Sequence, residues 1–309
     1  MSTNAKAYWA MSIAMITVGS SFVIGKQVSA VFPVYLASAI RCGIAAAILL
    51  LLLYIREGIP KIIPKDRFWL FVQSLTGVFG FGICLLYGLK YTSAGESGVI
   101  MSTTPMIIAL ISFLFLRERL SLYKWFSVAL AVIGIAVLKL NHVEVETSTV
   151  AGAASLVWLG NLLVFFAVIG EALFTIFGKV LSARLSPLAI ATFVTLLGFL
   201  MFLPFGIYEA FTFDFAQPTI LDWTYILYYA VVVTVLGFIL WYYGVSLVPT
   251  GTSAVFTGLI AVSSLVFSYI FPGEPFHWSH LAGIICVLAA IVISSIPSKG
   301  EENKAAIGA

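Results

Sequence analysis

Long apolar runs separated by short polar turns fill almost the whole chain of 309 residues. A helix needs about 20 predominantly apolar residues to cross roughly 30 Å of hydrocarbon. Ten runs approach or exceed this length. The pattern therefore predicts transmembrane helices at 7–27, 34–54, 68–90, 94–116, 121–140, 156–181, 187–208, 223–246, 251–271 and 277–296.

An internal repeat relates the two halves of the chain. Positions 156 residues apart match, namely Tyr87, Gly88, Gly95, Ser97 and Val99 in the first copy and Tyr243, Gly244, Gly251, Ser253 and Val255 in the second. Each copy then runs through an apolar stretch to an acidic turn, at Glu118 and at Glu274. We expect these two carboxylates to act as turn and cap residues.

Each half holds five predicted spans, and an odd number inverts the second half relative to the first. Inverted halves are a common way to build an alternating-access carrier. We therefore predict an all-α integral membrane protein with ten transmembrane helices, arranged as two inverted five-helix repeats around a central cavity. The predicted units are a first repeat at 1–142, a linker at 143–155, a second repeat at 156–297 and a cytoplasmic tail at 298–309.

Composition supports a membrane environment and excludes several classes of protein. The chain is 61% hydrophobic and only 9% charged, whereas soluble domains carry roughly 25% charged residues. No basic patch is interleaved with aromatics on a polar scaffold, so no nucleic-acid partner is expected. The three cysteines lie inside apolar runs without the spacing of a metal site, and no cofactor is indicated.

The distribution of Lys and Arg predicts the orientation. With a cytoplasmic N-terminus, the inside segments hold 12 of the 16 basic residues and the outside connections hold 3, while Arg41 lies within a span. Cytoplasmic loops of membrane proteins carry an excess of Lys and Arg. Both termini are therefore predicted to be cytoplasmic, with the protein in the inner (cytoplasmic) membrane.

Two charged residues inside predicted spans are candidates for substrate binding. A charge at the centre of a membrane helix costs about 2.5–3.5 kcal/mol on insertion scales. Glu171 is able to bind a substrate ammonium or accept a proton, or else to make a structural hydrogen bond to a neighbouring helix. Arg41 is able to attract a substrate carboxylate, or else to snorkel or pair structurally. Lys26 and Lys179 occupy matching repeat positions, and we interpret them as interfacial anchors.

Aromatic residues, 15% of the chain, are the second group of candidates. An aromatic-lined cavity suits an apolar or aromatic solute through area burial and ring stacking. The alternative is that these rings face lipid or pack between helices. The aromatic candidates for the cavity are Phe79, Tyr87, Trp158, Phe165, Phe238, Trp241 and Tyr242.

Glycine and proline mark candidate hinges. Small residues such as Gly80 and Gly244 let helices approach closely, which serves either gating or static packing. Pro105 follows Ser102, Thr103 and Thr104 in the middle of a span, so it frees a backbone carbonyl that the hydroxyls can satisfy. A bend at Pro105 is therefore expected.

The motifs resemble those of a known family. The stretch Gly19–Lys26 with Pro33 and Arg41 is similar to the first two helices of EamA-type proteins in the drug/metabolite transporter superfamily. The stretch 87–120 resembles that family's third-to-fifth-helix signature, and the stretch 251–275 resembles it again. The chain has Val18 where the family often has Trp. The resemblance implies a ten-helix carrier of small metabolites, and the YddG-type exporters of aromatic and other neutral amino acids look most similar.

These observations predict a secondary transporter that exports neutral or aromatic amino acids by alternating access. The alternative is the same fold carrying a drug-like cation, a nucleoside or an organic phosphate. A channel or an intramembrane enzyme is a remote alternative, because neither a pore-lining ring nor a motif such as HExxH is present. The expected partners are a small-molecule substrate and the lipid bilayer, and the expected state is a monomer, with a dimer as the alternative.

Overall fold

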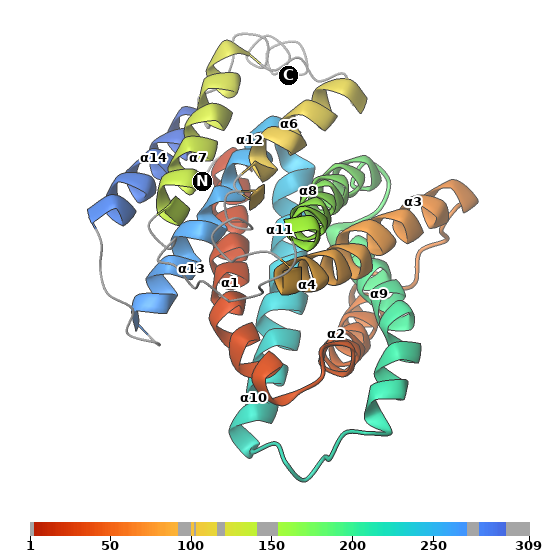
Figure 1. Ribbon diagram of the computed structural model, residues 1–309. Coiled ribbons are helices and arrows are strands. Elements are labelled where there is room, and N and C mark those ends of the chain that lie inside the picture. The colour runs from red at the N-terminus through yellow and green to blue at the C-terminus, as the bar shows by residue number, and fades with distance from the viewer. Residues whose placement is uncertain are drawn as a thin grey trace.

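The structure, a computed structural model, describes residues 3–91, 100–101, 103–115, 121–140, 154–270 and 278–294. Every regular element in these ranges is a helix (Figure 1). Each of the ten predicted spans coincides with a helix or contains part of one. The predicted acidic turns at Glu118 and Glu274 and the tail at 298–309 lie outside the described residues. So does the predicted linker at 143–155, except for its last two residues, which open α8.

The α-helices are labelled α, as in Figure 1, and the π-helical segments are labelled η. They are α1 (Thr3–Val31), α2 (Val34–Arg56), α3 (Pro64–Ser74), η1 (Leu75–Gly80), α4 (Phe81–Tyr91), α6 (Thr104–Phe115), α7 (Leu122–Leu140), α8 (Ala154–Leu181), α9 (Pro187–Ala210), α10 (Ile220–Tyr228), η2 (Tyr229–Leu236), α11 (Gly237–Leu247), α12 (Thr250–Phe256), α13 (Gly258–Ile270) and α14 (Trp278–Ser294).

Length and surface both fit a membrane-spanning protein. Within the described part of the chain, six apolar helices are long enough to cross a membrane, and shorter apolar helices accompany them. Large apolar side chains such as Leu51, Phe115 and Phe166 are exposed on the outside of the bundle. Exposed apolar surface of this extent is rare on soluble monomers, so hydrocarbon is the medium that surrounds it.

Two hydrogen bonds establish that the repeat partners α2 and α9 are antiparallel. The Leu36 N–H, at the start of α2, donates to Glu209 Oε2 at the end of α9, 2.8 Å away. At the other end, the Ser186 hydroxyl before α9 donates to Glu57 after α2. Because α2 and α9 hold equivalent places in the two halves, their opposite directions mean that the halves are inverted.

The two ends of the bundle differ in charge, and we name them accordingly. The basic end carries the connections after α2 and α8, which are joined by an ion pair of 3.1 Å between Arg184 and Asp66. The residues Arg56, Lys61, Lys65 and Arg67 also belong to it. The acidic end carries Glu209, Asp214 and Asp222 around the α9–α10 connection, which lies at the bottom of Figure 1.

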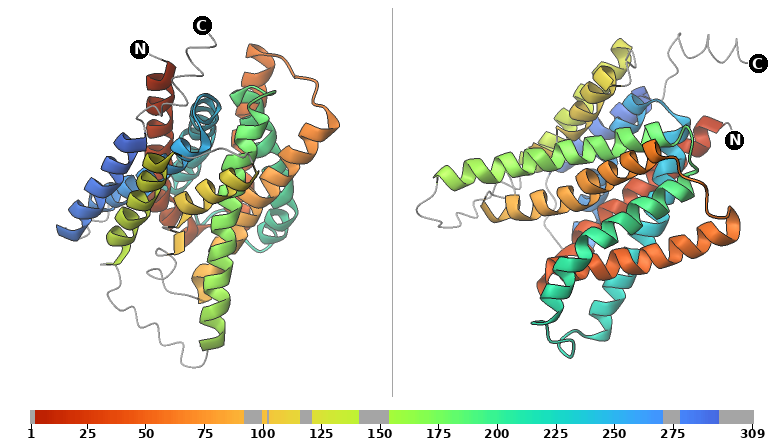
Figure 2. Two further views of the ribbon diagram at one scale, coloured as in Figure 1. Left: turned by 90° about the horizontal axis from the view of Figure 1, so that it is seen from above. Right: turned by 90° about the vertical axis from the view of Figure 1, so that its right-hand side faces the viewer.

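The halves pack through matched contacts that cross from one repeat to the other. Helix α4 packs against α8, and its repeat partner α11 packs against α1. Figure 2 shows α8 running beside the continuous α3–η1–α4 rod. A methyl group at Gly88 would lie 3.2 Å from the Gly160 carbonyl oxygen, and one at Gly244 would lie 3.1 Å from the Ala7 carbonyl oxygen. Glycine therefore brings both helix pairs into close contact.

Two π-helical segments, η1 and η2, interrupt equivalent spans of the two halves. Shifting η1 by the repeat offset places it inside η2, so the irregularity belongs to the repeat. A methyl group at Gly80 would lie 2.6 Å from the Leu75 carbonyl oxygen, so this π-helical turn needs glycine. The apolar pattern of the predicted spans 68–90 and 223–246 gives no sign of either segment. Short π-helical segments are frequent at functional sites.

Candidate functional site

The helix is interrupted just before Pro105, where the sequence predicts a bend within a continuous span. Thr103 lies in a turn and α6 begins at Thr104. Pro105 has no N–H, so the Met101 carbonyl, four residues earlier, loses its helical donor. The Thr104 hydroxyl lies 2.8 Å from Met101 O and replaces that donor, and Thr103 Oγ1 lies 2.7 Å from Ile100 O. The break is therefore satisfied by hydroxyls, while motion about it remains a prediction.

Glu171 meets this break from the other half of the molecule. It lies on α8, half-buried, with its Oε2 atom 3.3 Å from Thr104 Oγ1. Thr104 has one hydroxyl hydrogen, so an ionised Glu171 competes with Met101 O for it. A protonated Glu171 would instead donate to Thr104 Oγ1 and leave the bond to Met101 undisturbed. The arrangement can therefore accommodate either protonation state of this carboxyl group.

Three aromatic rings pack together where α8 meets α11. The centroid of Phe174 is 5.4 Å from that of Phe238 and 5.6 Å from that of Tyr242, and the last two are 6.1 Å apart. We call Phe174, Phe238 and Tyr242 the aromatic trio. Such centroid distances are typical of attractive aromatic pairs. The trio joins α8 to α11, and its member Phe174 follows Glu171 by three residues on α8.

Gln73 on α3 joins the trio through its amide. Its Nε2 donates to the Phe174 carbonyl at 2.8 Å and to the Tyr242 hydroxyl at 3.0 Å. The side chain is fully buried, and Gln73 Oε1 has no hydrogen-bond partner in the described part of the chain. Gly178 leaves room for this arrangement, since a methyl group there would lie 2.7 Å from Tyr242 Cε1. A buried unsatisfied acceptor costs about 1–3 kcal/mol, so Gln73 Oε1 is an enclosed acceptor that would gain from a donor.

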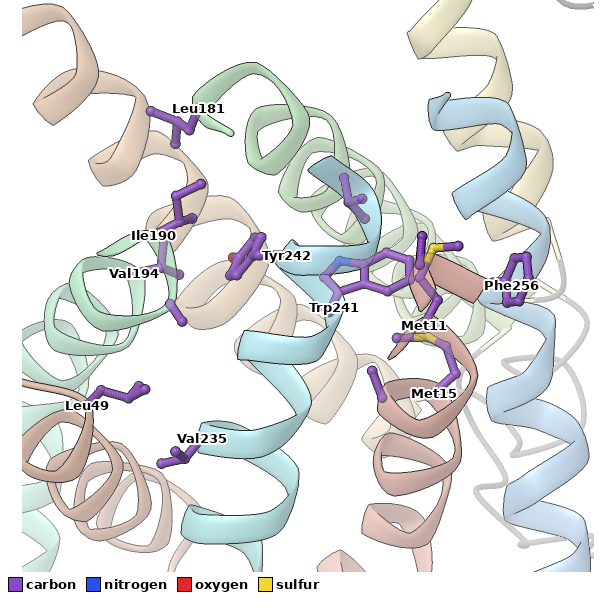
Figure 3. Packing of buried hydrophobic residues seen from close by; sticks show 14 of the residues in the cluster. Met11, Met15, Leu49, Leu181, Ile190, Val194, Val235, Trp241, Tyr242 and Phe256 are labelled. Atoms are coloured by element: carbon purple, nitrogen blue, oxygen red, sulfur yellow. The ribbon is translucent and has the colours of Figure 1, made fainter. Parts of the chain in front are cut away.

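The other predicted aromatic residues lie elsewhere. Figure 3 shows Trp241 extending from α11 toward Met11 and Met15, away from Tyr242. Phe79 packs on Phe202, with centroids 5.0 Å apart. These residues belong to helix-packing clusters.

Tyr87, Trp158 and Phe165 also lie apart from the trio. The Tyr87 hydroxyl is 3.2 Å from the Tyr35 hydroxyl, between α4 and α2. Trp158 is 67% exposed and Phe165 is 40% exposed, both on α8. Among the predicted site residues, the structure brings Phe238 and Tyr242 into contact, and it places Glu171 against Thr104.

Arg41 lies in a different part of the molecule. Its guanidinium carbon is 4.5 Å from the ring centroid of Tyr229, at the start of η2. A cavity of about 160 Å³ adjoins it. A larger cavity of about 550 Å³ lies toward the basic end between α2, α9 and α11. Neither cavity is lined by Glu171 or by the aromatic trio, which fills the space where α3, α8 and α11 meet.

Lys179 differs from the interfacial anchor that the sequence suggested. Its Nζ donates to the carbonyl oxygens of Val245, Ser246 and Val248, at 2.9, 3.2 and 2.7 Å. A cation is favourable at a helix C-terminus, where carbonyls lack helical donors. Lys179 therefore ties the end of α8 to the end of α11.

Three site residues were missed by the sequence analysis, namely Gln73, Thr104 and Phe174. Gln73 carried a usable signal, because an amide within an apolar run must find a partner in the membrane. The sequence indicates Thr104 only as a hydrogen-bond donor for the backbone carbonyl that Pro105 leaves free. Phe174 carried no signal of its own among 25 phenylalanines.

Comparison with known proteins gives the family. The family model described as "EamA-like transporter family" matches residues 5–140 and 158–296. The chain belongs to the EamA-like transporter family. This membership agrees with the two interlocked halves, and it places the chain among transporters and not among enzymes.

Similar EamA-like proteins carry transporter names. "Uncharacterized transporter YetK" of Bacillus subtilis (strain 168) is 47% identical, over 95% of this chain and 88% of that protein. A "Probable terminal-alkyne amino-acid exporter" of Streptantibioticus cattleyicolor is 22% identical, over 97% of both chains. A solved crystal structure at 15% identity superposes with a TM-score of 0.77 and covers 94% of this chain and 96% of its own. The last likeness supports the fold alone.

Proposed function

We propose that this EamA-like protein is a secondary transporter that exports neutral or aromatic amino acids by alternating access. One observation carries the proposal: Glu171 of the second half meets Thr104 of the first half, and the same helix α8 carries Phe174 of the aromatic trio, whose carbonyl binds Gln73 of the first half. A carboxylate, an aromatic surface and an amide oxygen thus come from helices of both halves. Alternating access requires such a site between two elements that move relative to each other.

The chemistry of these groups suits an amino acid with an apolar side chain. The Glu171 carboxylate is complementary to an ammonium group, and the trio offers rings for stacking or area burial. Gln73 Oε1 accepts a further N–H donor. The relative named as an amino-acid exporter supports the same substrate class.

A drug-like cation is the second candidate, because a carboxylate beside aromatic faces also binds larger ammonium groups. An organic phosphate is less suited, since among the described residues no basic side chain contacts Glu171 or the trio. A channel would conduct without saturation, and this difference is measurable.

The basic end is proposed to face the cytoplasm, with both termini on that side. The proposal is supported by the excess of Lys and Arg in the connections of the basic end and by the carboxylates at the acidic end. Export across the cytoplasmic (inner) membrane would then move the substrate from the basic end of the bundle to its acidic end.

The test is uptake into proteoliposomes that hold the purified full chain, with a panel of amino acids, nucleosides and cationic drugs. We expect saturable transport of neutral and aromatic amino acids. In Glu171→Gln we expect a fall of about tenfold or more, because hydrogen bonds to charged groups contribute about 1.5–3 kcal/mol. Asp214→Asn, in the exposed α9–α10 connection, is the matched control and should transport normally.

Failure of neutral and aromatic amino acids to enter or compete would remove the substrate assignment. Repeating the assay under an imposed pH gradient examines the role of Glu171 itself. If Glu171→Gln leaves both the rate and its pH dependence unchanged, Glu171 takes no part in transport.

A further inference from the structure

The cavity beside Arg41 is a partly open pocket that Glu171 does not line. Its volume is about 160 Å³, and its walls come from α1, α2, α10 and η2. None of its lining residues is among those that contact Glu171 or the aromatic trio. At roughly 30 Å³ per water molecule, the space holds about five waters or one small organic molecule.

The guanidinium of Arg41 bonds to the neighbouring Cys42 thiol and keeps most of its five donors unused. One face rests on the ring of Tyr229, and no Asp or Glu of the described residues pairs with it. A guanidinium carries five N–H donors in a fixed plane. Charged groups within membrane spans almost always pair with another group or line a functional cavity. Arg41 therefore presents donors to the adjacent space.

The other walls of the pocket define the group that would bind there. Ser38, one turn before Arg41 on α2, adds a hydroxyl, while Val28 and Ile226 add apolar surface. The first turn of α2 contributes partial positive charge, because its N–H groups lack helical acceptors. A planar guanidinium binds a planar carboxylate through two parallel hydrogen bonds.

We propose that this pocket is a binding site for the carboxylate of a small monocarboxylic acid, including an amino acid, and that it is separate from the Glu171 site. The carboxylate pairs with Arg41 and its short hydrocarbon part contacts Val28 and Ile226. Glu209 binds the N–H of Leu36, the neighbour of the lining residue Ala37. That nearby negative charge disfavours multiply charged anions more than a monocarboxylate or a zwitterion.

The test uses 2,3-butanedione, which modifies accessible arginines, on the full chain in phosphatidylcholine nanodiscs. Modification of each arginine is followed by peptide mass spectrometry. At a propionate concentration of roughly ten times its Kd, Arg41 modification should slow by about tenfold, because only unoccupied protein reacts. Arg56 at the basic end should be unaffected, and the neutral analogue propionamide should give no protection.

A pocket-filling variant supplies the matched control. Ala37→Leu keeps Arg41 but occupies the pocket, so propionate should no longer change the modification rate. The proposal is overturned if Arg41 is not modified even without propionate, if propionate protects Arg41 and Arg56 equally, or if propionamide protects as well. Protection only in discs that contain phosphatidylglycerol would assign the site to a lipid phosphate instead. Because no step measures transport, failure of the proposed function would leave these outcomes interpretable.

Discussion

At the scale of single residues, one amide group links three helices in the middle of the bundle. Gln73 on α3 holds the Phe174 carbonyl on α8 and the Tyr242 hydroxyl on α11. Its Nε2 donors are both used, whereas its oxygen is open. The amide therefore links Phe174 to Tyr242 and leaves one buried acceptor without a partner in the described part of the chain.

Removing the Tyr242 hydroxyl should cost little stability but loosen this link. We expect Tyr242→Phe to lower the free energy of unfolding by about 0.6 kcal/mol, the average for hydrogen bonds between membrane helices, and by no more than about 1.7 kcal/mol. Thermal unfolding in detergent measures the change. Tyr243→Phe is the control, because Tyr243 is partly exposed at the neighbouring position. Equal losses in both variants would contradict a specific role for the Tyr242 bond.

Thr104 should need its hydroxyl but not its methyl group. Thr104→Val removes the donor for Met101 O at the Pro105 break and the contact with Glu171. We expect a loss of about 1–3 kcal/mol in stability, as for a buried acceptor left unsatisfied, together with reduced transport. Thr104→Ser keeps the donor and should behave like the native protein. The idea fails if Ser and Val at this position give the same transport rate and the same unfolding temperature.

At the scale of elements, glycine decides how close the two halves lie. Gly244 of α11 packs on α1 and Gly88 of α4 packs on α8, at equivalent repeat positions. Gly237, also on α11, is less crowded, since a methyl group there would lie 3.4 Å from Thr17 Oγ1. Two glycines of one helix therefore have different structural roles.

This difference predicts opposite effects of the same substitution. In Gly244→Ala the new methyl group would overlap Met11 Cγ, and overpacking typically costs about 1–3 kcal/mol. In Gly237→Ala the new methyl group would make only ordinary van der Waals contacts, and the higher helix propensity of alanine is worth up to about 1 kcal/mol. Thermal unfolding should therefore show a lower midpoint for Gly244→Ala and an equal or higher midpoint for Gly237→Ala. Destabilisation by both would contradict the packing difference.

At the scale of the whole molecule, inversion sends equivalent helices in opposite directions. One hydrogen bond at each end of the antiparallel pair α2 and α9 holds the two helices together. Each half contributes helices to the packing of the other, because α4 contacts α8 and α1 contacts α11. The two halves are thus not separate domains side by side but interlocked parts of one bundle.

The proposed orientation predicts which surface is reachable from outside the cell. Single cysteines introduced at Tyr208 and Lys61, near the acidic and basic ends, are exposed enough to react. With a membrane-impermeant thiol reagent on intact cells, Tyr208→Cys should be labelled and Lys61→Cys should be labelled only after the membrane is opened. The unmodified chain, with its three native cysteines, gives the background. The reverse pattern would place the basic end outside.

The sequence alone determined the spans, the repeat and the family resemblance. Span length follows from the thickness of the hydrocarbon, and the repeat is a property of residue order. Pro105 could be recognised as a break because its missing N–H is a local property. Glu171 could be singled out because a carboxylate within a span is costly wherever the span packs.

Only the tertiary structure decided which side chains meet. A helix that is apolar all round gives no periodic signal for its inner face, so Trp241 and Tyr242 looked equivalent although they point to opposite sides of α11. The π-helical segments η1 and η2 add a further rotation that residue order did not reveal. Phe174 and Gln73 join the site only because α3, α8 and α11 converge there, and that convergence depends on packing between halves far apart in the sequence.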